Sequence, residues 1–160
     1  MVGRVIFAAG LAFIAGQSML AHGQAETAER ISFTTLPSKY VEGTSTVAGA
    51  LNLPSRNADK VPAVLILHSS GGVDARGAGY AAALNKAGIA TLEIEMFARG
   101  QTVQTHPTAQ QNMPQVFGAL GYLASRPEID PARIGVMGFS WGGILSIVSA
   151  TDRFTTEFTQ

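Results

Sequence analysis

The stretch "VPAVLILH", residues 61–68, limits the possible folds of this chain more than any other feature. It is an unbroken apolar run between a polar loop and the glycine-rich turn "SSGGVDARG". Such a run is typical of a central strand that is covered on both faces. We therefore expect a sheet with helices packed against both of its faces.

Strand and helix patterns alternate along the rest of the chain. Strands are predicted at 31–36, 46–53, 89–96 and 134–138, and helices at 77–88, after 112 with Pro114 near the first turn, and at 144–150. A long polar loop is predicted from Phe97 to Asn112, and the final "TDRFTTEFTQ" shows no strand or domain-closing pattern. This alternation predicts an α/β fold with a mostly parallel sheet, whose chemistry gathers at the carboxyl ends of the strands.

Composition excludes several classes of function. The 160 residues are enough for one domain with a core. Eleven basic residues balance eleven acidic ones, so nothing indicates a nucleic-acid partner. The chain has no cysteine, which excludes disulfides, a cysteine nucleophile and a thiolate metal site.

The N-terminal segment has the pattern of a secretory signal. Arg4 is followed by an apolar run from Val5 to Ala15, and small residues follow at Ala21 and Gly23. The alternative is a membrane anchor, but the run is shorter than the roughly 20 residues that span a bilayer. We expect residues 1–23 to be a cleaved signal, and the mature protein to be periplasmic or secreted without a stable membrane anchor.

The motif "GFSWGG", residues 138–143, predicts a turn that presents a nucleophile. A short apolar strand precedes Ser140 and a helix follows it, so Gly138 and Gly142 are needed where side chains would collide. Ser140 would then project above the sheet, beside a helix N-terminus that stabilises negative charge. The alternative is a glycine-rich turn with an incidental serine.

The segment "HSSGG", residues 68–72, is the candidate partner of the serine turn. Acyl transfer needs backbone N–H groups aimed at the developing oxyanion. We expect one from Trp141 and one from Ser70, with Gly71 as the alternative to Ser70. His68 ends a strand and is interpreted as structural.

Three stretches, "VLILHSSGG", "AGIATLEIEMFARG" and "IDPARIGVMGFSWGG", together resemble the dienelactone hydrolase family of α/β-hydrolases. The resemblance covers roughly residues 40 to 150. It implies esterase or lactonase chemistry through a nucleophile, an acid and a histidine, with no metal or organic cofactor. The enzymes that give the family its name have a cysteine as nucleophile. Ser140 in that position favours a more ordinary serine esterase.

The acid and the base are not found where this fold would place them, after the nucleophile. Only Asp152 and Glu157 follow Ser140, and no histidine does. Asp152 would lie on the order of 15–18 Å further along a helix, so it is a poor triad acid. We therefore expect residues 24–160 to be the N-terminal part of a hydrolase domain, with the strand before Ser140 as an open apolar edge.

Earlier residues offer weaker candidates. His106 lies in the loop after the strand ending near Glu95 and is interpreted as a solvated or pocket-wall residue rather than a base. His22 leaves with the signal. Glu95 and Arg99 form an ordinary ion pair or help to bind a substrate carboxylate.

The sequence therefore indicates a serine hydrolase that acts on a small-molecule ester or lactone through an acyl-enzyme on Ser140. The alternative is a catalytically inactive truncated remnant, or a binding module that keeps the hydrolase fold. The substrate itself is not predicted from the sequence.

The predicted signal has a direct test. When the full chain is expressed in a bacterium, we expect export and cleavage after Gly23 or Ala25, because the Arg4-led apolar segment fits a signal peptide. N-terminal sequencing of the exported protein measures the cleavage site. A membrane-bound product that retains Met1 would contradict the prediction.

Overall fold

The computed structural model describes residues 28–55, 59–97 and 107–158. The predicted signal, His22, Arg99 and His106 lie outside these residues. The strands are β1 (Glu29–Thr34), β2 (Thr46–Asn52), β3 (Val61–Leu67), β4 (Ala90–Ile94) and β5 (Ile129–Gly138). The helices are α1 (Ala75–Lys86), α2 (Ala109–Ser125), α3 (Trp141–Ser149) and α4 (Asp152–Phe158).

The described strands form one sheet in the order β1-β2-β4-β3-β5. β3 pairs in parallel with β4 and with β5, whereas β2 is antiparallel to both β1 and β4. The predicted α/β class is confirmed, and the sheet is mixed, with two parallel and two antiparallel pairings. No helix lies between β1 and β2, and strands that follow one another without a helical crossover pair antiparallel.

The prediction that residues 61–68 form a central strand is confirmed. β3 lies between β4 and β5, and Leu65, Ile66 and Leu67 are fully buried. β5 forms one edge of this sheet, as expected for the strand before Ser140.

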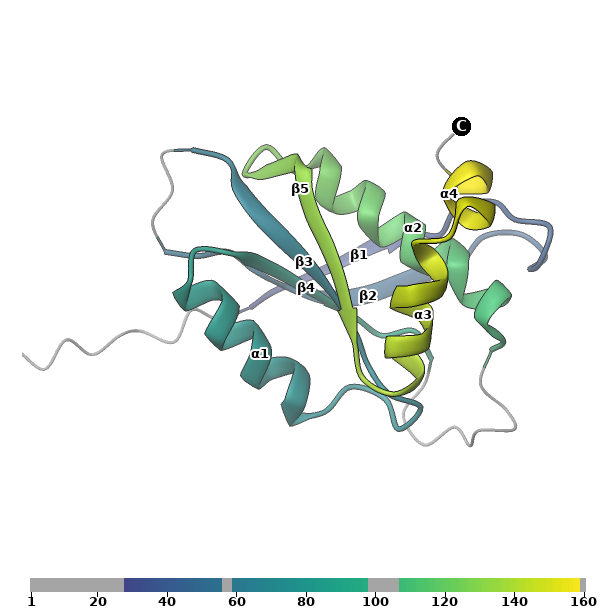
Figure 1. The fold of residues 1–160 in the computed structure, drawn as a ribbon, viewed down its shortest axis with the longest axis horizontal. Helices are drawn as coiled ribbons and strands as arrows, with labels where there is room; N and C mark the ends of the chain where they lie inside the picture. The colour runs from purple at the N-terminus through teal and green to yellow at the C-terminus, as the bar shows by residue number, and fades with distance from the viewer. Residues whose placement is uncertain (1–27, 56–58, 98–106, 159–160) are drawn as a thin grey trace, which may run out of the picture.

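Helices cover both faces of the sheet (Figure 1), with α1 on one face and α2 and α3 on the other. The main hydrophobic core lies beneath α2 and α3. Its sheet residues include Leu65, Leu67 and Leu92, and these pack with Val116 of α2 and Leu145 of α3. Side chains alternate between the two faces of a strand, so the strand residues next to Leu65, Leu67 and Leu92 point toward α1.

The face beneath α1 is more polar. Thr91 and Glu93 of β4 are buried there, and among the described residues neither Thr91 Oγ1 nor Glu93 Oε1 has a hydrogen-bond partner. The Glu93 carboxyl lies so close to Gly77 of α1 that a side chain at Gly77 would overlap it. Burial raises the pKa of Glu93 to about 7, and the nearby charges of Asp74 and Glu95 act in the same direction.

Helix α2 begins earlier than the sequence patterns predicted. Thr108 caps it: its hydroxyl accepts from Gln111 N, while the Gln111 side chain accepts from Thr108 N. The prediction of a loop as far as Asn112 was therefore wrong, because this capping box was overlooked. Pro114 lies inside α2 rather than in its first turn.

Two further boundaries differ from expectation. β5 begins at Ile129 rather than at the predicted residue 134, because Ile129 already pairs with Val61 through an irregular register. The C-terminal segment, for which no element was predicted, forms α4. Phe154 of α4 is buried, and the Phe158 ring stacks on Phe117 with centroids 4.9 Å apart.

The buried Glu93 predicts a pH-dependent stability. Its pKa is raised in the folded state from 4.5 to about 7, so the stability that its protonated form contributes is complete below about pH 4.5 and is lost as the pH rises through about 7. Relative to Glu93→Gln, the wild-type chain should lose on the order of 2 kcal/mol of unfolding free energy between about pH 5 and pH 8. Urea unfolding across this range measures the difference.

Glu95→Gln is the matched control, since Glu95 lies just after the same strand but is exposed. This variant should keep most of the wild-type pH dependence, because burial, and not the Glu95 charge, is the largest cause of the raised pKa of Glu93. If Glu93→Gln also keeps it, Glu93 is ionised throughout and the prediction is wrong.

Candidate active site

Ser140 lies at the sharp turn between β5 and α3. Its φ is 50° and its ψ is −109°, and among the described residues it is the only non-glycine with a positive φ. Such a conformation costs about 1–3 kcal/mol and persists only where the surroundings enforce it. The strained turn predicted from the motif is confirmed, and the Ser140 residue is exposed.

Two glycines make this turn possible. A Cβ on Gly138 would overlap the backbone of Gly142, and a Cβ on Gly142 would overlap the carbonyl of Leu67 at the end of β3. Hydrogen bonds hold the same region: Phe139 N donates to Leu67 O (3.1 Å), and Gly142 N donates to Phe139 O (3.0 Å). The turn is therefore packed directly against the end of β3.

The loop after β3 lies at the same sheet edge as the serine turn. Leu67 and Gly138 are register partners in parallel strands, so the residues after each emerge side by side. Ser69 and Gly72 form an isolated bridge that closes the loop, and Gly72 N donates to Ser69 O (3.0 Å). The structure thus brings together the two segments that the sequence analysis singled out, with Ser70 at the tip of the loop.

His68 is structural, as predicted. It is buried, its Nε2 accepts from Met96 N (2.9 Å), and its Nδ1 lies 2.7 Å from Ser69 O. Because Nε2 accepts, the proton is on Nδ1 and the ring is neutral. Burial lowers the pKa of His68, in agreement with this form. Both ring nitrogens are engaged, so His68 is not placed to act as a base for Ser140.

Trp141 is the first residue of α3, directly after Ser140. Its indole Nε1 donates to Asn112 Oδ1 (3.2 Å), and Asn112 in turn donates to Gln115 Oε1 (2.9 Å). Asn112 is fully buried in α2. Asn112 was not among the candidate residues, because the sequence pattern predicted a loop at this position.

The acidic residues considered for the candidate site either pair with other side chains or lie on α4, away from the serine turn at the start of α3. Glu95 pairs with Arg30 of β1 (3.3 Å), while Arg99, its expected partner, lies outside the described residues. Asp152 is exposed at the start of α4. Glu157 accepts from Tyr40 Oη (3.1 Å), so it ties α4 to the turn after β1.

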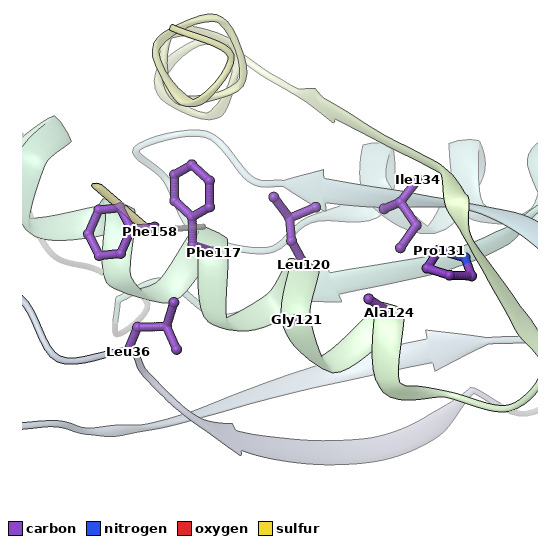
Figure 2. A pocket seen from close by; sticks show the side chains of 8 residues that line it. All are labelled: Leu36, Phe117, Leu120, Gly121, Ala124, Pro131, Ile134 and Phe158. Atoms are coloured by element: carbon purple, nitrogen blue, oxygen red, sulfur yellow. The ribbon is translucent and has the colours of Figure 1, made fainter. Parts of the chain in front are cut away.

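An apolar groove of about 490 Å³ lies elsewhere, between α2, β5 and α4 (Figure 2). Its lining residues are Leu36, Phe117, Leu120, Gly121, Ala124, Pro131, Ile134 and Phe158. None of these is a candidate catalytic residue, and no charged side chain lines the groove. The groove therefore presents an apolar surface without a catalytic or charged side chain.

The described residues contain neither a membrane-spanning helix nor a metal-binding cluster. No helix in those ranges is long and apolar enough to cross a membrane. Within the same ranges, no group of three or more histidine and acidic side chains is placed to hold a metal ion.

The mixed sheet, the helices on both faces and the serine turn before α3 define an α/β-hydrolase fold. The sequence profile of the dienelactone hydrolase family matches residues 47–157. The chain therefore belongs to the dienelactone hydrolase family, as the sequence motifs indicated. Among curated proteins, none matches the chain in sequence.

Solved structures show the same fold. Est1E from Butyrivibrio proteoclasticus is 21% identical with a TM-score of 0.58, over 78% of this chain and 45% of its own. The α/β hydrolase GrgF from Penicillium sp. is 20% identical with a TM-score of 0.64, over 79% and 43%. A dienelactone hydrolase from Anabaena variabilis is 22% identical with a TM-score of 0.60, over 82% and 60%. The chain thus spans about half the length of these proteins.

Replacing two glycines of β5 by alanine should have very different effects on the unfolding free energy. Gly138→Ala should cost about 3 kcal/mol of unfolding free energy, because its Cβ would overlap backbone that cannot move independently. Gly135→Ala on the same strand should change it by less than about 0.5 kcal/mol, because a Cβ there meets nothing within 4 Å. Urea unfolding of both variants measures the contrast, and equal costs would contradict the geometry.

Proposed function

We propose that this protein is a serine hydrolase of carboxylic esters or lactones that reacts through an acyl-enzyme on Ser140. The observation that carries the proposal is the strained φ of 50° at Ser140, at the start of α3 and beside the loop after β3. The packing of α3 on the end of β3 enforces this costly conformation, and the serine that adopts it is exposed rather than buried in the core. The conformation presents a hydroxyl to an incoming carbonyl group.

In the proposed reaction the ester C–O bond is exchanged for a bond to Ser140 Oγ, the alcohol leaves with a proton, and water later hydrolyses the acyl-enzyme. The Ser140 hydroxyl first attacks the carbonyl carbon of the substrate. Negative charge then develops on the carbonyl oxygen, and the N–H groups of Trp141 and Ser70 stabilise it. Gly71 N donates weakly to Ser69 Oγ (3.4 Å), which supports Ser70 over Gly71 as the second donor. The N-terminus of α3 adds a favourable dipole at the same place.

The proton on Ser140 needs a base. His68 is engaged at both nitrogens, and no histidine follows Ser140 in these 160 residues. Removal of a triad base commonly reduces the rate by several orders of magnitude, while the oxyanion donors and substrate binding leave a residual rate. We therefore propose weak esterase activity for these residues alone. We also propose a periplasmic or secreted location, on the pattern of residues 1–23.

This proposal predicts slow hydrolysis of p-nitrophenyl acetate that a base in the buffer can enhance. The purified chain should act barely above background, because an unactivated hydroxyl is a weak nucleophile. Imidazole should raise the rate beyond its own effect on the ester, by serving as the missing base. The same assay on Ser140→Ala supplies the background, and mass spectrometry locates the acyl group.

Two outcomes would contradict parts of the proposal. Identical rates for wild type and Ser140→Ala, with and without imidazole, would exclude Ser140 as the nucleophile and favour a non-catalytic module. Robust Ser140-dependent turnover without imidazole would reveal a base within the chain, and His106 would be the first residue to replace.

A further inference from the structure

Arg76, in the first turn of α1, contacts both segments of the candidate site. Its Nη2 donates to Ser69 Oγ at 2.9 Å, in the loop after β3. Its guanidinium carbon lies 5.3 Å from the ring centroid of Phe139, the residue before Ser140. One side chain from α1 thus connects the loop that holds Ser70 to the turn that holds Ser140.

On the loop side, Arg76 controls the orientation of a serine that organises the loop. Ser69 is buried, and its hydroxyl oxygen receives both the Arg76 guanidinium and the weak bond from Gly71 N. Its carbonyl accepts from Gly72 N and from the His68 ring. A change in the Ser69 side chain therefore reaches the backbone N–H group of Gly71, directly after Ser70.

On the serine side, Arg76 and Tyr80 of α1 both contact Phe139. The Tyr80 and Phe139 centroids are 5.4 Å apart, and the guanidinium adds a cation–π contact. Phe139 N is bonded to Leu67 O, so the backbone and the ring of this residue are both held. The position of Phe139 sets the direction in which Ser140 leaves the strand.

Asp74 fixes the guanidinium between these two contacts. Arg76 Nε lies 3.0 and 3.1 Å from the two carboxylate oxygens of Asp74, which also caps α1 by accepting from Arg76 N (2.9 Å). This pair is exposed and contributes little to stability by itself. Nη2 itself donates both to Asp74 Oδ2 and to Ser69 Oγ, so the ion pair holds this nitrogen beside Ser69.

We propose that Arg76 is a positioning residue that keeps the oxyanion donors of the loop and of the serine turn aligned with each other. The catalytic part of this inference rests on the proposed function. The bridging part does not, because it concerns only the coupling between two backbone segments.

Backbone NMR of the full chain tests the bridge without any need for turnover. Arg76→Ala should shift the amide resonances of Ser70 and Gly71 together with those of Phe139 and Trp141. Arg153→Ala is the matched control, because Arg153 of α4 also lies over an aromatic ring, 5.0 Å from the Phe154 centroid, but outside the site. This control should move none of the four resonances. If Arg76→Ala shifts only the amide resonances of Ser70 and Gly71, Arg76 does not connect the loop to the serine turn, and the proposed link between them is wrong.

Acylation of Ser140 by p-nitrophenyl acetate, with imidazole present, tests the positioning role. Arg76→Ala should slow the acylation step about 10- to 100-fold with little change in the ester concentration for half-saturation, because misplaced donors weaken transition-state binding. Arg76→Lys should recover only part of the rate, because lysine lacks the planar fork. Guanidinium ions in the buffer should partly restore Arg76→Ala.

The outcomes separate the two ideas. An unchanged Ser140-dependent acylation rate in Arg76→Ala would overturn the positioning role while the proposed function stands. Acylation that is the same in wild type and Ser140→Ala would overturn the proposed function, and the NMR result would then decide the bridge alone.

Discussion

The close approach between the first turn of α3 and the end of β3 is the contact on which the candidate site depends. At Gly142 the two backbones are too near for any side chain. Because α3 is held there, the chain has almost no length in which to turn from β5 into the helix. The strain falls on Ser140, whose positive φ results from this packing. The strained geometry of Ser140 thus arises from the way a helix packs on a sheet.

Much of the fold could be predicted because its signals are local. The uninterrupted apolar run of β3 by itself predicts a central strand that is covered on both faces. The serine turn is predicted just as locally, because it needs glycine at two fixed positions. The resemblance of the motifs to a family added the expected order of the elements. The irregular start of β5 and the antiparallel pairing of β1 and β2 depend on tertiary contacts, which no local pattern carries.

The elements that were missed show which signals are weak. The only start signal noted for helix α4 is Asp152 in its first turn. The helix is held because Phe154 is buried and the Phe158 ring stacks on the distant Phe117. At the site, Ser140 could be predicted from its motif. Asn112 and Arg76 could not, because their partners lie 29 and 7 residues away and depend on how α1 and α2 pack.

The helices on the two faces of the sheet are attached by different interactions, and those of α1 affect the candidate site. The face beneath α2 and α3 is a continuous apolar core, whereas the face beneath α1 includes the buried Glu93. Burial alone therefore holds α1 less firmly. Polar contacts secure its ends: Asn85 Nδ2 donates to Asn52 O and Ile89 O near the C-terminus, and Arg76 bonds Ser69 near the N-terminus. The contact that anchors the start of α1 is the same one that shapes the loop after β3, so the docking of α1 and the geometry of the candidate site are coupled.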